Sequence, residues 1–232
     1  MKYKNLTIIG TSHIAPESLR EVEKVILDEK PGLVALELDR KRLAALLSKK
    51  VGRPSIKDIR RVGLKGWLFA VIGGWVERKL GQKVGVNPGA EMLRAFHIAQ
   101  SVGAKVALID QDIEITLRRF SKALTWKEKG RLVVDLFKGL LFRPKIKLDL
   151  RKVPSEKLIK KLMSEVKKRY PNIYRVLVLE RNDYMAHKLA ILLQRFPDEQ
   201  IVAVIGAGHE REIVTLLKKY LKAEQLNRHK KR

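Results

Sequence analysis

The sequence of 232 residues contains no cysteine. A disulfide framework, a thiolate nucleophile and any metal site built on cysteine are therefore excluded. The lack of cysteine also fits a reducing compartment, so we expect a cytoplasmic protein. No uninterrupted apolar run reaches the roughly 18 residues that a membrane-spanning helix needs. Apolar residues make up 45% of the chain, which is enough for a packed core and argues against general disorder.

Acidic residues are scarce beside basic ones, with 25 Asp and Glu against 50 Lys and Arg and a net charge of +25. The excess is concentrated in residues 118–175, which carry 19 basic and 5 acidic side chains. Such a block suits an anionic membrane surface, nucleic acid or an acidic partner, and the first is favoured over nucleic acid. A solvated face of long basic side chains is the plainer interpretation.

Four short apolar runs have the composition of buried parallel strands, and they cover residues 6–10, 32–38, 104–110 and 200–206. Helical patterns with proline near their start follow the first run at Pro16 and precede the third at Pro88. The sequence therefore predicts a single α/β domain over residues 1–232, with a mainly parallel central sheet and helices on both faces.

Two helical insertions interrupt this α/β pattern, at residues 55–85 and at 118–175, and the second is strongly basic. Apolar residues recur at helical spacing from Leu64 to Leu80 and again from Leu132 to Leu141. Each stripe needs an apolar partner, which would be the core, a second subunit in a homodimer, or a lipid headgroup layer. Packing within the protein or in a dimer is the commoner outcome.

Two of the five histidines stand in matching settings. "GTSH" follows the first predicted strand and ends at His13, and "GAGH" follows the last and ends at His209. Glu37 ends the second predicted strand and Asp110 the third. Because ligands gather at the carboxyl ends of parallel strands, we expect these four side chains at one edge of the sheet.

Two imidazoles and a carboxylate are a common ligand set for a catalytic divalent metal. His13, His209 and Glu37 are therefore candidate ligands, with Glu37 alternatively a general base on a metal-bound water. "GAGH" also resembles half of a dinucleotide-binding motif, but Glu210 and Glu212 would repel a pyrophosphate at that helix start. The metal site is the preferred interpretation.

Four segments resemble the TraB family, which includes bacterial pheromone-shutdown proteins, archaeal homologues and, more distantly, the Tiki metalloproteases. They occur in order at residues 10–43, 88–119, 180–190 and 201–213, with the strings "GTSHIAPE", "LIDQDIE", "ERNDY" and "IGAGHERE" among them. The resemblance implies an erythromycin-esterase/ChaN-like α/β fold. Many pheromone-shutdown members also carry a C-terminal membrane region; because this sequence stops at "NRHKKR", we expect either a soluble short form or a truncated one.

The resemblance implies a metal centre at His13, Glu37 and His209, with Asp110, Glu180 and Tyr184 as neighbouring binding residues. It adds Arg181, which would stabilise an oxyanion or bind a peptide carboxylate, or would instead form a salt bridge with Glu180 or Asp183. Two positions depart from the family pattern. Gln111 stands where arginine is usual, and "ERND" replaces "ERDE".

The sequence thus predicts a metal-dependent hydrolase, most simply a peptidase that uses Mn²⁺, Co²⁺ or Zn²⁺ and acts on peptides, including signalling peptides. In this interpretation Glu37 and Arg181 are the catalytic residues. The alternative is a non-catalytic binding protein that docks its basic helical region on an anionic membrane or on nucleic acid. In either case the protein would be cytoplasmic, with a possible peripheral position at the membrane.

Overall fold

The computed structural model describes residues 1–12, 16–48, 55–84, 89–141 and 155–229. A five-stranded sheet lies at its centre, in the order β1-β2-β5-β3-β4. The strands are β1 (Lys2–Tyr3), β2 (Leu6–Thr11), β3 (Leu33–Leu36), β4 (Lys105–Leu108) and β5 (Ile201–Gly206). All neighbouring pairs are parallel except β1 with β2. The predicted α/β class with a mainly parallel sheet is confirmed, and the antiparallel strand β1 is an addition to it.

Alternate residues of each central strand enter two separate apolar layers, because successive side chains of a strand point to opposite faces. On β5, Ile201, Ala203 and Ile205 join one layer, and Val202 and Val204 join the other. All six residues of β5 are buried. This two-sided burial explains why the strand is a continuous apolar run in the sequence.

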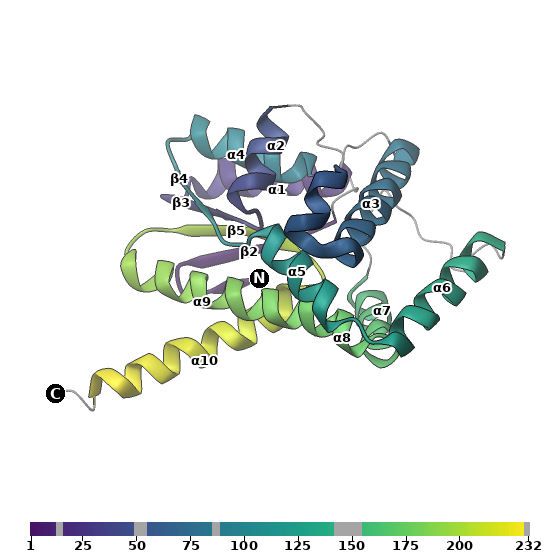
Figure 1. Cartoon of the computed structure of the whole chain (residues 1–232). Helices are drawn as coiled ribbons and strands as arrows, with labels where there is room; N and C mark the ends of the chain where they lie inside the picture. The colour runs from purple at the N-terminus through teal and green to yellow at the C-terminus, as the bar shows by residue number, and fades with distance from the viewer. Residues whose placement is uncertain (13–15, 49–54, 85–88, 142–154, 230–232) are drawn as a thin grey trace.

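Helices cover both faces of the sheet (Figure 1). The first layer packs against α9 (Glu180–Arg195) and α10 (Glu210–His229), and the second against α1 (Pro16–Glu29) and α4 (Ala90–Ser101). The short helix α2 (Arg40–Leu47) begins just after β3, with Asp39 as its N-cap. The result is a three-layer sandwich with the sheet as its middle layer.

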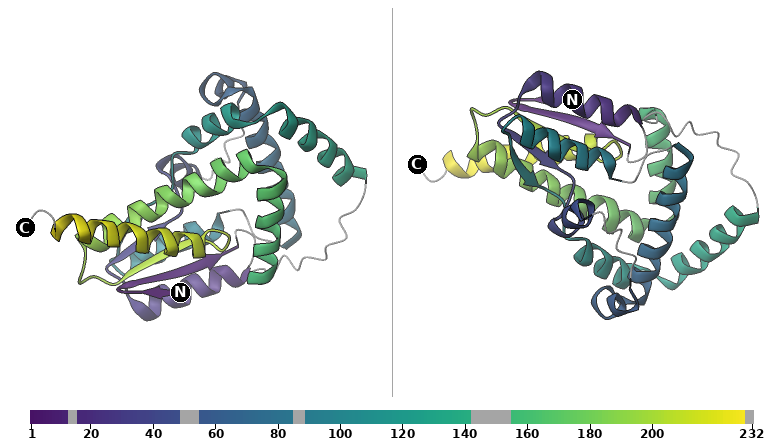
Figure 2. Two further views of the ribbon diagram at one scale, coloured as in Figure 1. Left: turned by 90° about the horizontal axis from the view of Figure 1, so that it is seen from below. Right: turned by 90° about the horizontal axis from the view of Figure 1, so that it is seen from above.

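The remaining helices lie beyond one end of the sheet. They are η1 (Ile56–Asp58), α3 (Ile59–Val84), α5 (Ile113–Ala123), α6 (Trp126–Leu141), α7 (Glu156–Arg169), α8 (Pro171–Tyr174) and the π-helical segment η2 (Arg175–Leu179). Helix α3 packs along α5, whereas α6 extends away from the sheet (Figures 1 and 2). Helix α3 lies within residues 55–84, and α6 and α7 lie within the basic segment 118–175. Among the described helices, none is long and apolar enough to cross a membrane.

Helix α9 offers a matched test of the core. Leu189 is fully buried between the sheet and α10, whereas Ile191 on the same helix is 44% exposed. We expect Leu189→Ala to lower the free energy of unfolding by about 2–5 kcal/mol, through lost burial and the cavity that remains. Ile191→Ala should change it by less than about 1 kcal/mol. Urea denaturation followed by circular dichroism measures both, and equal losses would contradict this packing.

Candidate functional site

Strand β5, the last in the sequence, lies between β2 and β3, so the ends of all three strands are neighbours. Thr11 pairs with Gly206, and the backbone N–H of Ala207 donates to the Thr11 carbonyl over 2.8 Å. Gly10 permits this close approach, since a Cβ there would stand 3.3 Å from the Cα of Ala207 and 2.6 Å from Oε2 of Glu210. The chain that follows β5 is thereby held against the end of β2.

Glu37 follows β3 and lies at the centre of this edge, with 1% of its side chain exposed. Its Oε2 accepts the backbone N–H of Gly206 over 2.6 Å. Its Oε1 accepts from Nη2 of Arg181 over 2.5 Å. Burial of a carboxylate is costly unless it is paired and hydrogen-bonded, and both conditions are met here.

Arg181, at the start of α9, joins Glu37 to a second buried carboxylate, that of Asp110. Its Nε donates to Asp110 Oδ1 over 3.0 Å and its Nη2 to Asp110 Oδ2 over 2.7 Å. Arg42, in the first turn of α2, donates to the same Oδ2 over 3.0 Å. Two guanidinium groups thus face two carboxylates.

Burial alone would lower the pKa of Arg181, but the negative charges of Glu37 and Asp110 raise it above its ordinary value. The salt bridge considered for Arg181 therefore has different partners from those expected. Glu180 instead pairs with Arg119 over 2.9 Å, and Asp183 accepts a hydrogen bond from the Tyr220 hydroxyl over 2.6 Å.

His209, at the turn between β5 and α10, is oriented by Asn182, a fully buried residue of α9. The amide nitrogen of Asn182 donates to Glu212 Oε2 over 3.0 Å, so its oxygen faces His209 Nδ1 at 2.5 Å. An amide oxygen only accepts, hence Nδ1 carries the ring proton. The other ring nitrogen, Nε2, faces Glu37 Oε1 at 3.6 Å.

This arrangement of His209 and Glu37 suits a divalent metal ion. A histidine ligand commonly donates its other N–H to a fixed acceptor, as His209 does to Asn182. A distance of 3.6 Å is long for a hydrogen bond, but two ligand atoms bonded to one tetrahedral metal at about 2.0–2.2 Å lie about 3.4 Å apart. Within the described residues no cluster of three or more such ligands occurs, and His13 lies outside them.

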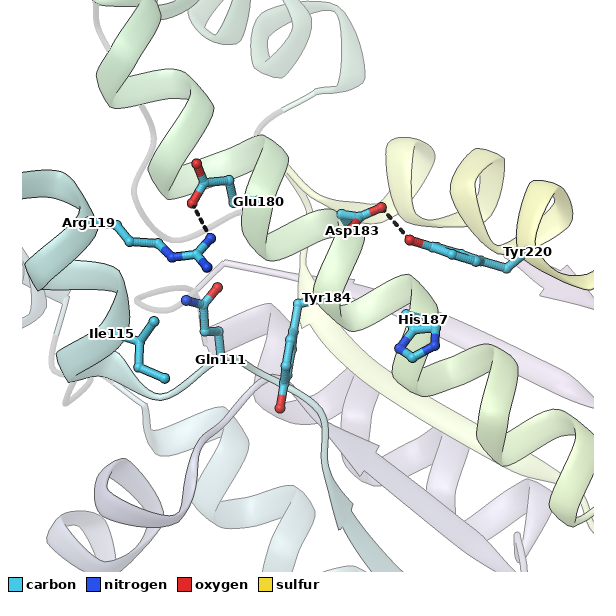
Figure 3. A pocket seen from close by; sticks show the side chains of 8 residues that line it. All are labelled: Gln111, Ile115, Arg119, Glu180, Asp183, Tyr184, His187 and Tyr220. Atoms are coloured by element: carbon cyan, nitrogen blue, oxygen red, sulfur yellow. Dashed lines mark hydrogen bonds and ion pairs between the residues drawn. The ribbon is translucent and has the colours of Figure 1, made fainter. Parts of the chain in front are cut away.

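The other predicted residues have different positions. Glu180 and Tyr184 line a surface groove of about 470 Å³ that crosses α9 between α5 and α10, together with Gln111 (Figure 3). Neither Glu37 nor His209 lines this groove. The structure therefore brings together Glu37, Asp110, Arg181 and His209, and places Glu180 and Tyr184 apart from them.

Sequence reasoning missed Asn182 and Arg42. The string "ERND" departs from the family pattern, but only the three-dimensional contact shows that its Asn182 orients His209. Arg42 lies in the "LDRKR" string, where nothing distinguishes it from the basic residues beside it. Its role follows from Asp39, which accepts the backbone N–H groups of Lys41 and Arg42 and so fixes the start of α2.

Comparisons with known proteins agree over most of the chain. The family model described as TraB/PrgY/gumN matches residues 2–223. An uncharacterized protein of Methanocaldococcus jannaschii is 36% identical over 221 residues, which are 93% of this chain and 54% of that protein. A TraB domain-containing protein of Homo sapiens is 28% identical over 226 residues, covering 87% of this chain and 60% of the relative. The chain thus spans somewhat more than half the length of these relatives.

The buried ion pairs of Arg181 predict that its replacement destabilises the protein far more than replacement of an exposed arginine on the same helix. Arg181→Met would remove the guanidinium that pairs with both Glu37 and Asp110. We expect a loss of about 3–5 kcal/mol in the free energy of unfolding. Arg195→Met, at the exposed end of the same helix, should cost less than about 0.5 kcal/mol. Equal urea midpoints for the two variants would contradict the network.

The hydrogen bond from His209 to Asn182 predicts one imidazole tautomer. In the parent protein, ¹⁵N NMR should show a protonated Nδ1 and an unprotonated Nε2 for neutral His209, with His209→Ala identifying the signals. Asn182→Leu removes the acceptor, and the tautomer should shift toward the Nε2–H form. Asn182→Asp keeps an acceptor and should preserve the parent tautomer. If the leucine variant gives the parent spectrum, Asn182 does not set the tautomer.

Proposed function

Because the chain belongs to the TraB/PrgY/gumN family, we propose that the cluster of Glu37, Asp110, Arg181 and His209 is the catalytic centre of a metal-dependent hydrolase that cleaves peptides. The observation that carries this proposal is the orientation of His209. Its Nδ1 is occupied by Asn182, so that Nε2 and a buried carboxylate oxygen face each other at 3.6 Å.

His209 and Glu37 would hold the metal ion, with His13 as the third protein ligand. His13 follows Thr11 by two residues, and Thr11 pairs with Gly206 at the end of β5. A bound Mn²⁺, Co²⁺ or Zn²⁺ would lower the pKa of a coordinated water and polarise the substrate carbonyl. Thiolate ligands are absent from the chain, so nitrogen and oxygen donors would make up the site.

Glu37 has two possible contributions at this centre, as a ligand or as the acceptor of a proton from water. Its Oε2 is held by the Gly206 N–H and its Oε1 by Arg181 Nη2, so both oxygens are fixed in place. Such fixed oxygens need little reorganisation during a reaction. The nearby charge of Arg181 favours the carboxylate form of Glu37, as either role requires.

Arg181 would orient the substrate. Its Nε and Nη2 donate to Asp110 and Glu37, and Nη1 makes a longer hydrogen bond of 3.4 Å to the Leu177 carbonyl. A guanidinium has five N–H groups, so among the described contacts one N–H of Nη1 remains for a substrate oxygen. The side chain of Arg181 is 17% exposed and that of Glu37 is 1% exposed, so a substrate carbonyl or carboxylate can reach Arg181.

We also propose that the domain has the erythromycin-esterase/ChaN-like fold. A parallel sheet whose last strand lies between two earlier ones, with charged residues at its carboxyl edge, is consistent with the erythromycin-esterase/ChaN-like class. The relatives called TraB domain-containing proteins share this region over 60% of their length, so the substrates of the longer proteins need not follow from this domain alone.

Metal titration tests the proposed centre. His13→Ala and His209→Ala should each weaken binding of Mn²⁺, Co²⁺ or Zn²⁺ by more than about a hundredfold in calorimetry, because each removes a ligand. His97→Ala and His187→Ala remove histidines from α4 and α9 and should bind as the parent does. A His209 variant with the parent's affinity would show that the site is wrong.

Activity is measured separately, with a mixture of peptides and mass spectrometry of the products. The parent loaded with each metal should cleave peptide bonds, and Glu37→Gln should lower kcat by at least about a hundredfold. If the parent binds metal but cleaves no peptide, the metal site would stand and the peptidase assignment would be wrong.

A further inference from the structure

Helix α6 (Trp126–Leu141) extends away from the sheet (Figures 1 and 2). Trp126, its first residue, is 84% exposed. Lys129 lies one turn further, with its ammonium 3.4 Å from the centre of the Trp126 ring, and exposed Leu132 follows at the same spacing. Residues three apart on a helix are neighbours, so these three side chains share one face of α6.

Helix α3 extends this face. Lys65 lies close enough to Lys129 for its positive charge to lower the pKa of Lys129, and its Nζ donates to the Ser121 carbonyl over 3.2 Å. Leu68 lies one turn from Lys65, and Leu64 lies one turn from Leu68. Leu64 is 62% exposed and Leu68 is 49% exposed. We call the combined area the Trp126 surface; it consists of Leu64, Lys65, Leu68, Trp126, Lys129 and Leu132.

The Trp126 surface carries positive charge that its own neighbours do not neutralise. Among the described residues, no carboxylate forms an ion pair with Lys65 or Lys129. Partial removal from water and the adjacent charge of Lys65 lower the pKa of Lys129. The segment around it, residues 118–175, holds 19 basic against 5 acidic side chains. Two ammonium groups held together in this setting favour an anionic partner.

We propose that the Trp126 surface docks on the headgroup layer of an anionic lipid membrane. The tryptophan ring is apolar with a polar N–H, a combination that favours the boundary between headgroups and acyl chains. The leucines would enter the edge of the apolar region, while the two lysines would contact lipid phosphates. An anionic membrane thus offers both an apolar region for the exposed leucines and phosphates for the two lysines.

Other occupants match this surface less well. In a symmetric dimer the same surface would meet itself, and the Lys65–Lys129 pair of one copy would approach that of the other. A nucleic acid backbone would pair with the lysines but would leave Leu64 and Leu68 without an apolar environment. The docking proposal is independent of the metal centre, which lies at the carboxyl edge of the sheet.

Vesicle binding tests the proposal with the full chain. The parent should co-sediment with vesicles of equimolar phosphatidylcholine and phosphatidylglycerol but not with pure phosphatidylcholine vesicles, and added salt should weaken this binding. The double variant Lys65→Gln/Lys129→Gln should bind about thirtyfold more weakly. The control, Lys24→Gln/Lys219→Gln, removes two exposed lysines from α1 and α10 and should bind nearly as the parent does.

A second variant separates insertion from charge alone. Trp126→Ala alters an exposed side chain, so its circular dichroism and melting temperature should match those of the parent. Its affinity for the anionic vesicles should fall at least about tenfold, and the blue shift of tryptophan fluorescence on binding should diminish. Trp126 variants that bind as the parent does would overturn the proposal.

Three further outcomes would also overturn it. The first is equal weakening by the two lysine double variants, which would indicate attraction by net charge alone. The second is binding to a duplex oligonucleotide, lost in Lys65→Gln/Lys129→Gln, without any vesicle binding. The third is a dimer in sedimentation equilibrium that Trp126→Ala dissociates.

Discussion

The guanidinium of Arg181 holds the carboxyl edge of the sheet together. Glu37 and Asp110 follow two adjacent strands, β3 and β4, and both are almost fully buried. Two carboxylates in such a place would repel each other and resist burial without a cation between them. Arg181 supplies that cation from α9, on one face of the sheet. The same contact therefore fixes α9 against the sheet and keeps charged groups at the candidate site.

The position of α9 in turn determines the orientation of the His209 ring and which of its nitrogens carries the proton. Arg181 points to the carboxylates, and the next residue, Asn182, faces His209 and Glu212 at the start of α10. One helix thus orients groups that come from three separate strand ends. This explains why the imidazole and the carboxylate face each other without a direct hydrogen bond, an arrangement that is consistent with the proposed metal centre.

Much of the framework could be predicted from the sequence because it depends on local pattern. Strands β2 and β5 are buried on both faces, so their sequences are nearly continuous apolar runs that predict a buried strand. The expected convergence of Glu37 and Asp110 follows from the rule that parallel strands end at one edge. The partners of Arg181 could not be predicted, since residues 37, 110 and 181 meet only through the packing of α9. Lys65 of α3 and Lys129 of α6 likewise come close only through the packing of separate helices, which no local pattern shows.

The place of β5 between β2 and β3 has a consequence for the order in which the protein forms. Leu6 and Leu33 both pair with Ile201, so the middle of the sheet stays open until that residue has been synthesised. Such contacts between distant parts of a chain close slowly. During translation β2 and β3 must wait with exposed strand edges, which favours assistance by a chaperone. Glu37 and His209 likewise come together only then, so a partly made chain has no assembled candidate site.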